Sequence, residues 1–156
     1  MRAGIIGLLA LVLAPTATGA QAAYVWDSGY QQGGAWAGVL NDDEGVVRID
    51  CPVEMTNPLP SLHYEPGRGQ ERGTGDEYLV LDIDGISFPL SAEWSDDGVA
   101  HHAGNWRGAA ELQEIVEALR RGKSLSVRLP RRDMAESFSL QGSGAALDDI
   151  LQGCLE

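Results

Sequence analysis

The sequence predicts an α+β fold: a single antiparallel, β-rich domain, built as a sandwich or a curved sheet, with a mid-chain helix and a short C-terminal helix. Between residues 35 and 102, short runs alternate apolar and polar side chains, which is typical of strands with one buried face. Asp84-Gly85 separates two such runs, and this pair favours a hairpin because glycine accepts a positive φ. After residue 105 the apolar spacing becomes helical. Strands in succession, with helices set apart from them, favour α+β.

The first predicted hairpin lies near the start of this region. Residues 35–40 and 46–51 are β-prone runs, and the segment 41–45, Asn-Asp-Asp-Glu-Gly, joins them as a longer loop. Residues 61–65 are a third expected strand. Residues 66–76 contain four glycines and no large apolar side chain, so they are expected to form a surface loop.

The clearest strand covers residues 78–84, where apolar side chains recur at every second position. After the Asp-Gly turn the same alternation returns over residues 86–90. A further short run begins at Trp94, and Asp-Asp-Gly at 96–98 predicts a turn after which residues 99–102 run back. These segments predict further antiparallel strands.

A helix is predicted after Asn105, which can cap its first turn. Arg120 and Arg121 stand near its end, where positive charge suits the helix dipole, and Gly122 is expected to stop it. The side chains that share its apolar face are Leu112, Ile115, Val116 and Leu119.

The last part of the chain predicts one more hairpin and a closing helix. Residues 125–129 alternate as a strand, and residues 138–140 are its expected partner across the connection 130–136. Ser143 can cap the final helix. The apolar residues on one face of that helix are Leu147, Ile150, Leu151 and Cys154.

This final third resembles a known family. The residues that carry the likeness are Leu119, Gly122, Lys123, Leu125 and Val127, followed by Phe138-Ser139-Leu140, Gly142 and Ala145-Ala146-Leu147. Over residues 112–151 they are similar to the closing segment of invasion-associated locus B proteins, which are small exported bacterial proteins. The resemblance rests on packing residues, and it implies an exported domain without an assigned catalytic site.

Residues 1–22 predict a cleaved signal peptide, followed by a single α+β domain over residues 23–156. Met1-Arg2 gives a positive start, residues 5–14 are mostly apolar, and Ala20-Gln21-Ala22 has the small-x-small pattern of a cleavage site. The alternative is a retained anchor, but the apolar run is roughly half of the ~20 residues that span a bilayer. We therefore expect a periplasmic or secreted protein with no stable membrane insertion after cleavage.

The two cysteines, Cys51 and Cys154, both follow the predicted cleavage site. An even number of cysteines in an oxidising compartment favours a disulfide bond between them. The alternatives are redox or metal-binding thiols, but the sequence contains no C-x-x-C, and two ligands this far apart match no zinc spacing.

The charge balance restricts the class of partner. The chain has 11 Lys+Arg against 23 Asp+Glu and a formal net charge of −12. A strongly acidic surface repels phosphate backbones, so nucleic acid is not an expected partner. A basic protein or another envelope component is the expected partner, with an association that weakens as salt rises.

Four aromatic residues near the mature N-terminus form a candidate partner-binding surface: Tyr24, Trp26, Tyr30 and Trp36. Large aromatic faces anchor interfaces and stack on sugars at a low entropic cost. The alternative for each of these residues is ordinary core packing.

The remaining candidates for chemistry are histidines beside an acidic turn. His101 and His102 are adjacent, so on a strand their side chains point to opposite faces and do not readily share one metal ion. With Asp96 and Asp97 they are weak candidates for a metal site, and neither a metal nor a cofactor is predicted. The acidic turns lack the spacing of a calcium-binding EF-hand loop, which leaves weak calcium binding as an open alternative.

No strong catalytic motif is present, and no catalytic residue is predicted. The leading hypothesis is an exported, acidic, non-catalytic domain that binds another envelope or extracellular macromolecule. The alternative is a small periplasmic hydrolase or metal-binding protein that uses His101 or His102 with nearby acids.

Overall fold

The structure is a computed structural model that describes residues 24–31, 33–52 and 59–154, and the side chains up to residue 150. The predicted signal peptide, residues 1–22, lies outside the described residues. Among the residues that are described, no helix is long and apolar enough to cross a membrane.

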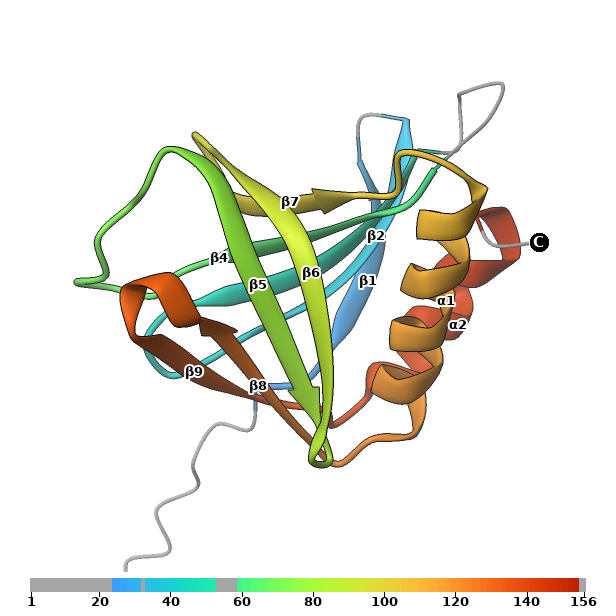
Figure 1. The fold of residues 1–156 in the computed structure, drawn as a ribbon. Coiled ribbons are helices and arrows are strands. Elements are labelled where there is room, and N and C mark those ends of the chain that lie inside the picture. The colour runs from blue at the N-terminus through green and yellow to red at the C-terminus, as the bar shows by residue number, and fades with distance from the viewer. Residues whose placement is uncertain (1–23, 32, 53–58, 155–156) are drawn as a thin grey trace, which may run out of the picture.

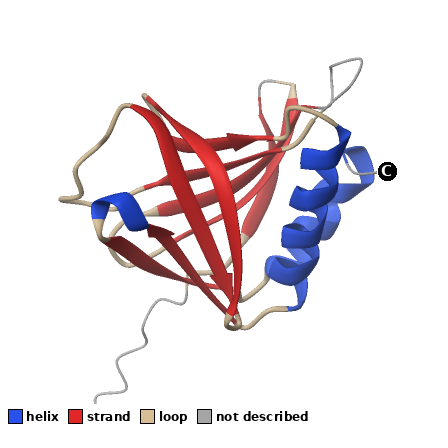
Figure 2. Cartoon of the chain, in the orientation of Figure 1, coloured by secondary structure: helices blue, strands red, loops and turns tan. Residues whose placement is uncertain are grey.

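Nine strands in the described part of the chain form one antiparallel sheet, in the order β1-β2-β3-β4-β7-β6-β5-β8-β9. The sheet curls, so that β5 and β6 cross in front of β2 and β4, and helices α1 and α2 lie side by side along one side of it (Figures 1 and 2). The predicted α+β class, with a curved sheet and two helices, is therefore confirmed. The strands are β1 (Asp27–Gln31), β2 (Gly34–Leu40), β3 (Val46–Pro52), β4 (Ser61–Glu65), β5 (Gly75–Ile83), β6 (Ile86–Ser95), β7 (Gly98–His102), β8 (Ser124–Leu129) and β9 (Met134–Ser139). The helices are α1 (Trp106–Arg121), the short 3-10 helix η1 (Pro130–Arg132) and α2 (Ser143–Cys154).

The predicted hairpins are present, and several strands are longer than expected. Asp84 and Gly85 both have positive φ, 50° and 85°, which the tight turn between β5 and β6 requires. β6 continues without a break through Trp94, because Trp94 pairs with Gly75 at the start of β5. β4 pairs with β7 and not with the next strand in the chain. The sequence patterns did not predict that pairing.

Trp26, just before β1, helps to join the two ends of the sheet. The backbone N–H of Trp26 donates to Gln141 O at 2.9 Å, and its indole Nε1 donates to Ser139 O at 2.8 Å. Trp26 is only 4% exposed. The Trp26 side chain therefore connects the start of the sheet to the end of β9, which helps to close the curl.

Helix α1 begins and ends as the sequence predicts. The Asn105 side chain accepts from the N–H groups of Arg107 and Gly108, and the four predicted core residues are buried. Gly122 ends the helix with an ordinary φ of −72°. A glycine is needed there for space, because a Cβ would lie 2.7 Å from Leu140 Cδ1.

The predicted capping role of Ser143 is corrected. Ser143 is the first residue of α2, and its buried hydroxyl donates to the carbonyl oxygens of Leu119 at 2.7 Å and Leu140 at 2.8 Å. The hydroxyl therefore satisfies carbonyls at the end of α1 and in the segment before α2, and so fixes the two helices relative to each other.

Two buried glutamates hold loops against the sheet. Glu136 of β9 accepts from Asn41 Nδ2 at 3.0 Å and from Gly67 N at 2.9 Å, which anchors the β2–β3 loop. Glu77 of β5 accepts from Trp94 Nε1 at 3.0 Å and from Arg132 Nε at 2.8 Å. Each carboxylate has hydrogen-bond partners, as a charge away from water requires.

Candidate functional site

A groove of about 630 Å³ lies on the face of β2, β3 and β4 that points away from the core. Successive residues of a strand face opposite sides of a sheet, so Ala35, Ile49 and Leu62 fill the core while their neighbours face the groove. At one end the groove reaches the β1–β2 turn, and at the other it reaches Glu65 and Asp97. Its volume is in the range of small-ligand sites, about 300–1,000 Å³.

Strand register brings together four polar or aromatic side chains from distant parts of the chain. Trp36 of β2 pairs with Asp50 of β3, and Asp50 pairs with Ser61 of β4. Ser61 in turn pairs with His102 of β7. Directly paired residues have adjacent side chains on the same face, so Trp36, Asp50 and Ser61 form a row across the groove, and His102 lies beyond its edge, in a neighbouring pocket.

A connected polar cluster occupies the middle of the groove. Asp50 Oδ2 lies 2.9 Å from Arg48 Nε and 3.3 Å from His63 Nε2. His63 Nε2 also lies 3.0 Å from Ser61 Oγ. The His63 ring packs edge-on against the His102 ring, with centroids 5.7 Å apart. The four polar groups therefore hold one another in fixed directions.

The environment of His63 disfavours its charged form. Burial lowers the pKa of His63, and the positive charge of Arg48 lowers it further, whereas the Asp50 carboxylate acts in the opposite direction. The net effect is a pKa below the usual 6.5. At neutral pH His63 is therefore an uncharged ring with one N–H donor and one acceptor nitrogen.

The cluster contains the residue types of a serine hydrolase, but in a different arrangement. In a catalytic triad the acid and the serine contact opposite nitrogens of the histidine, so that the acid orients the ring while the other nitrogen takes the serine proton. Here Asp50 and Ser61 both approach Nε2 of His63. The groups are better placed to donate and accept hydrogen bonds than to relay a proton.

The four predicted aromatic residues do not form one surface. Trp26 is buried in the core, so its expected role in partner binding is wrong. Tyr24 lines a different pocket, beside β9, and Tyr30 is 72% exposed on β1. Trp36 alone of the four lines the groove, half-buried, with its ring against Gly29.

The weak metal candidates are also separated. His101 is buried, with Nδ1 2.7 Å from Ser91 O, whereas His102 is exposed on the opposite face, as their adjacency predicted. Asp96 and Asp97 lie in the β6–β7 turn, before β7, while the two histidines end that strand. Within the described ranges no group of three or more His, Cys, Asp or Glu side chains could hold a metal ion.

Sequence reasoning overlooked His63, Ser61 and Asp50. The alternation in β4 places Ser61 and His63 on one face, which the sequence could have indicated. The pairing that brings Asp50 beside them depends on the register between β3 and β4, which the residues that connect the two strands do not specify.

The predicted disulfide stays a prediction, with favourable placement. Cys51 is fully buried at the core side of β3, and no described cysteine is free. Cys154 is the last residue of α2, a helix that contacts β3, but its side chain lies outside the described set.

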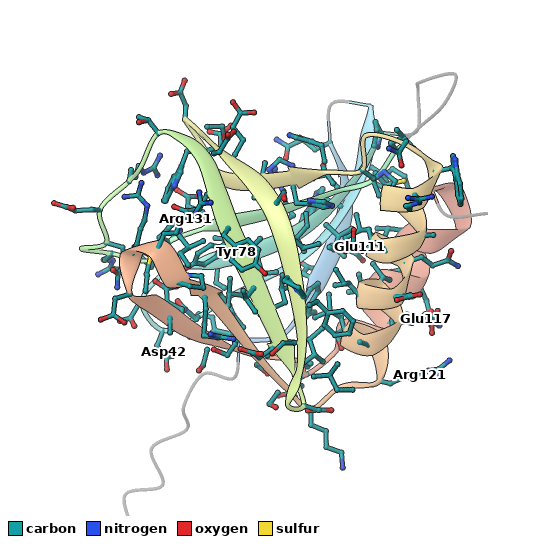
Figure 3. All side chains as sticks on the ribbon, viewed as in Figure 1. Asp42, Tyr78, Glu111, Glu117, Arg121 and Arg131 are labelled. Atoms are coloured by element: carbon teal, nitrogen blue, oxygen red, sulfur yellow. The ribbon has the colours of Figure 1, made fainter. Side chains whose placement is uncertain are left out.

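Two other pockets in the described part of the chain are lined by no tryptophan. One, of about 450 Å³, lies over β5, β6 and β7, where Tyr78 and Arg131 line it (Figure 3). The other, of about 660 Å³, lies between the β2–β3 loop and β9 and includes Asp42. Its buried carboxylate, Glu136, is already bonded to Asn41 and Gly67.

Comparison with known proteins gives one result. No curated protein and no solved structure matches the chain. A family described as YfjT matches residues 24–147. This range is most of the chain, and it includes every strand of the sheet and all the residues that line the groove. The chain therefore belongs to the YfjT family.

Proposed function

We propose that this protein is an exported, acidic, non-catalytic domain that binds another macromolecule of the envelope or extracellular space. The groove on β2, β3 and β4 is the proposed contact surface. The observation that carries the proposal is the position of Trp36 beside the linked Arg48, Asp50, Ser61 and His63 side chains. An aromatic anchor next to fixed polar groups is the usual composition of a binding site.

Three features support the proposal, and they concern catalysis, the class of partner and the location in turn. The Ser61–His63–Asp50 arrangement lacks the opposed contacts of a triad. The net charge of −12 disfavours nucleic acid as the partner. The leader-like residues 1–22 and the even number of cysteines support a periplasmic or secreted location.

The proposal is tested by the retention of the purified mature chain on envelope and culture-medium fractions of the native host. We expect Trp36→Ala to reduce retention about tenfold, since truncating an aromatic anchor removes more than ~1 kcal/mol of binding energy. Trp106→Ala is the matched control, because Trp106 is 76% exposed on α1 and does not line the groove. No retention of the wild-type chain, or equal retention of both variants, would contradict the proposal.

A small hydrolase is the second candidate, and we propose His63 as its centre in place of His101 and His102. The 3.0 Å contact between Ser61 Oγ and His63 Nε2 is the observation that favours it. A fluorophosphonate probe that labels the wild-type chain but not Ser61→Ala would establish this candidate. The binding proposal expects no labelling of either protein.

A further inference from the structure

We propose that the groove binds a linear, uncharged polysaccharide, with one sugar ring stacked on Trp36 and neighbouring sugars hydrogen-bonded along β3. This inference rests on the proposed function and names the class of its partner. It is argued from the length of the groove, the environment of Trp36 and the pairing of charges within it.

The groove is long enough for several linked units. It is lined along β3 from Val46 at one end to Pro52 at the other. These residues are the two ends of a seven-residue strand, which at about 3.3 Å per residue extends about 20 Å. A single sugar ring would fill only part of this length, so the shape favours a linear oligomer.

Trp36 supplies the apolar platform that sugar recognition needs. A Cβ at Gly29 would lie 3.1 Å from Trp36 Nε1 and 3.2 Å from Cε2, so the indole ring rests on β1 at a residue where a side chain would crowd it. Packing against β1 on one side fixes the ring, while the ring also lines the groove. A rigid aromatic surface can pack against the apolar C–H face of a sugar with little loss of entropy.

Two of the three carboxylates that line the groove, Asp50 and Glu65, are already paired with arginines, and the third, Asp97, lies at its end, which disfavours a strongly basic partner. Arg48 pairs with Asp50 at 2.9 Å, and Arg72 pairs with Glu65 at 2.7 Å. A basic peptide would need carboxylates that are not already neutralised, and it would have to compete with these arginines. An uncharged ligand binds without breaking either pair.

The same pairs match the hydrogen bonding of sugar hydroxyls. A hydroxyl both donates and accepts, so it suits a site that presents both kinds of group side by side. Arg48 offers N–H donors, Asp50 offers acceptor oxygens, and Ser61 and His63 offer both. The contacts of Asp50 and His63 fix the direction of their side chains. These side chains are 27% and 25% exposed, so a ligand can still reach them.

The test is isothermal titration calorimetry of the mature chain with cellohexaose, maltohexaose and the hexamer of N-acetylglucosamine, each beside its monomer. At least one hexamer is expected to bind, about tenfold or more tightly than its monomer. Trp36→Ala is expected to weaken binding about tenfold. Arg48→Gln, a change at a side chain that is 44% exposed, is a second variant that should retain the fold and weaken binding severalfold. Trp106→Ala should bind as the wild type does.

Salt distinguishes the polysaccharide from a basic peptide. Binding of an uncharged hexamer is expected to stay constant between about 50 and 500 mM salt, whereas binding of decalysine would fall steeply. Salt-sensitive binding of decalysine that Trp36→Ala abolishes, with no hexamer bound, would overturn the inference in favour of a basic peptide. If no hexamer binds while Trp36-dependent retention on envelope fractions persists, the polysaccharide inference fails and the proposed function stands. If no hexamer binds and Trp36-dependent retention is also absent, both the polysaccharide inference and the proposed function fail.

Discussion

Replacement of Arg132 is predicted to destabilise the fold strongly, because Arg132 compensates a buried carboxylate. Its Nε donates to Glu77 at 2.8 Å, and its guanidinium lies over the Trp94 ring, 4.9 Å from the centroid. The side chain of Glu77 is 2% exposed and that of Arg132 is 30% exposed. The change Arg132→Met keeps much of the apolar stem but leaves the Glu77 carboxylate without its cation.

The expected loss follows from the burial of Glu77. Removing one partner of a buried ion pair costs about 3–5 kcal/mol of the free energy of unfolding. Glu77 retains donors from Trp94 at 3.0 Å and the Tyr78 backbone at 2.9 Å, and the guanidinium is partly exposed. We therefore expect about 3 kcal/mol at pH 7, at the lower end of that range.

The loss should depend on pH. Burial by itself raises the pKa of Glu77, but hydrogen bonds from Trp94, Tyr78 and Arg132 outweigh it and hold the pKa below its usual 4.5. A lowered pKa contributes stability that is present above the unfolded-state pKa and lost as the pH falls through the folded-state pKa. In Arg132→Met one of the groups that lower the pKa of Glu77 is lost, so the effect of burial is larger and this pKa is higher than in the wild type. Acid therefore destabilises the variant less than it destabilises the wild type. The difference in the free energy of unfolding between the wild type and Arg132→Met should therefore be smaller at about pH 3 than at pH 7.

Urea unfolding at both pH values measures the two effects. With a slope of about 2 kcal/mol per M, the midpoint of Arg132→Met at pH 7 should lie about 1.5 M below that of the wild type. Arg131→Met is the matched control, because Arg131 is exposed and donates only to Asp76 O among its described contacts, at 3.2 Å. The control should stay within about 0.5 kcal/mol of the wild type. Equal losses in the two variants, or a gap that does not change with pH, would refute the reasoning.

Three further predictions concern stability. Gly122→Ala should lower the melting temperature by about 3 °C or more, because the new methyl group overcrowds the end of α1. Gly104→Ala is the control and should change the melting temperature little, since open space surrounds Gly104. Equal shifts in the two variants would contradict this prediction. Asp84→Asn should lower the melting temperature more at neutral pH than at pH 3, because backbone N–H donors hold the pKa of Asp84 below its usual range and that stability is lost as the pH falls through the folded-state pKa; a shift of the same size at both pH values would exclude the carboxylate as its source. Peptide mapping without reductant should recover Cys51 linked to Cys154, and reduction should lower the free energy of unfolding by up to about 4.7 kcal/mol; two alkylated thiols in unreduced protein would disprove the bond.

The local elements were predictable because their signals lie in adjacent residues. Asp84-Gly85 specifies its turn by φ alone, and Asn105 and the apolar stripe of α1 specify that helix. The length of β6 was less predictable. Trp94 belongs to the same strand as Ile86 because Trp94 pairs with Gly75. That contact depends on how far β5 extends toward the N-terminus.

The candidate site could be predicted only in part. Trp36 was singled out as an aromatic with a binding role, but its three companions separate into the core, another pocket and the edge of the sheet. His101 and His102 were expected on opposite faces, and they are. The resemblance of residues 112–151 to invasion-associated locus B proteins stays a prediction, and those residues lie away from the groove.

The sequence by itself determined the class of the fold, most of the turns and the buried face of strands with clear alternation such as β5, since all three depend on spacing along the chain. It did not predict β1. Only the tertiary structure decided that β4 pairs with β3 on one side and β7 on the other. That pairing places Asp50 beside Ser61 and His63. Strand register between distant segments depends on the packing of the whole sheet, so no local pattern contains it, and the groove is a product of that register.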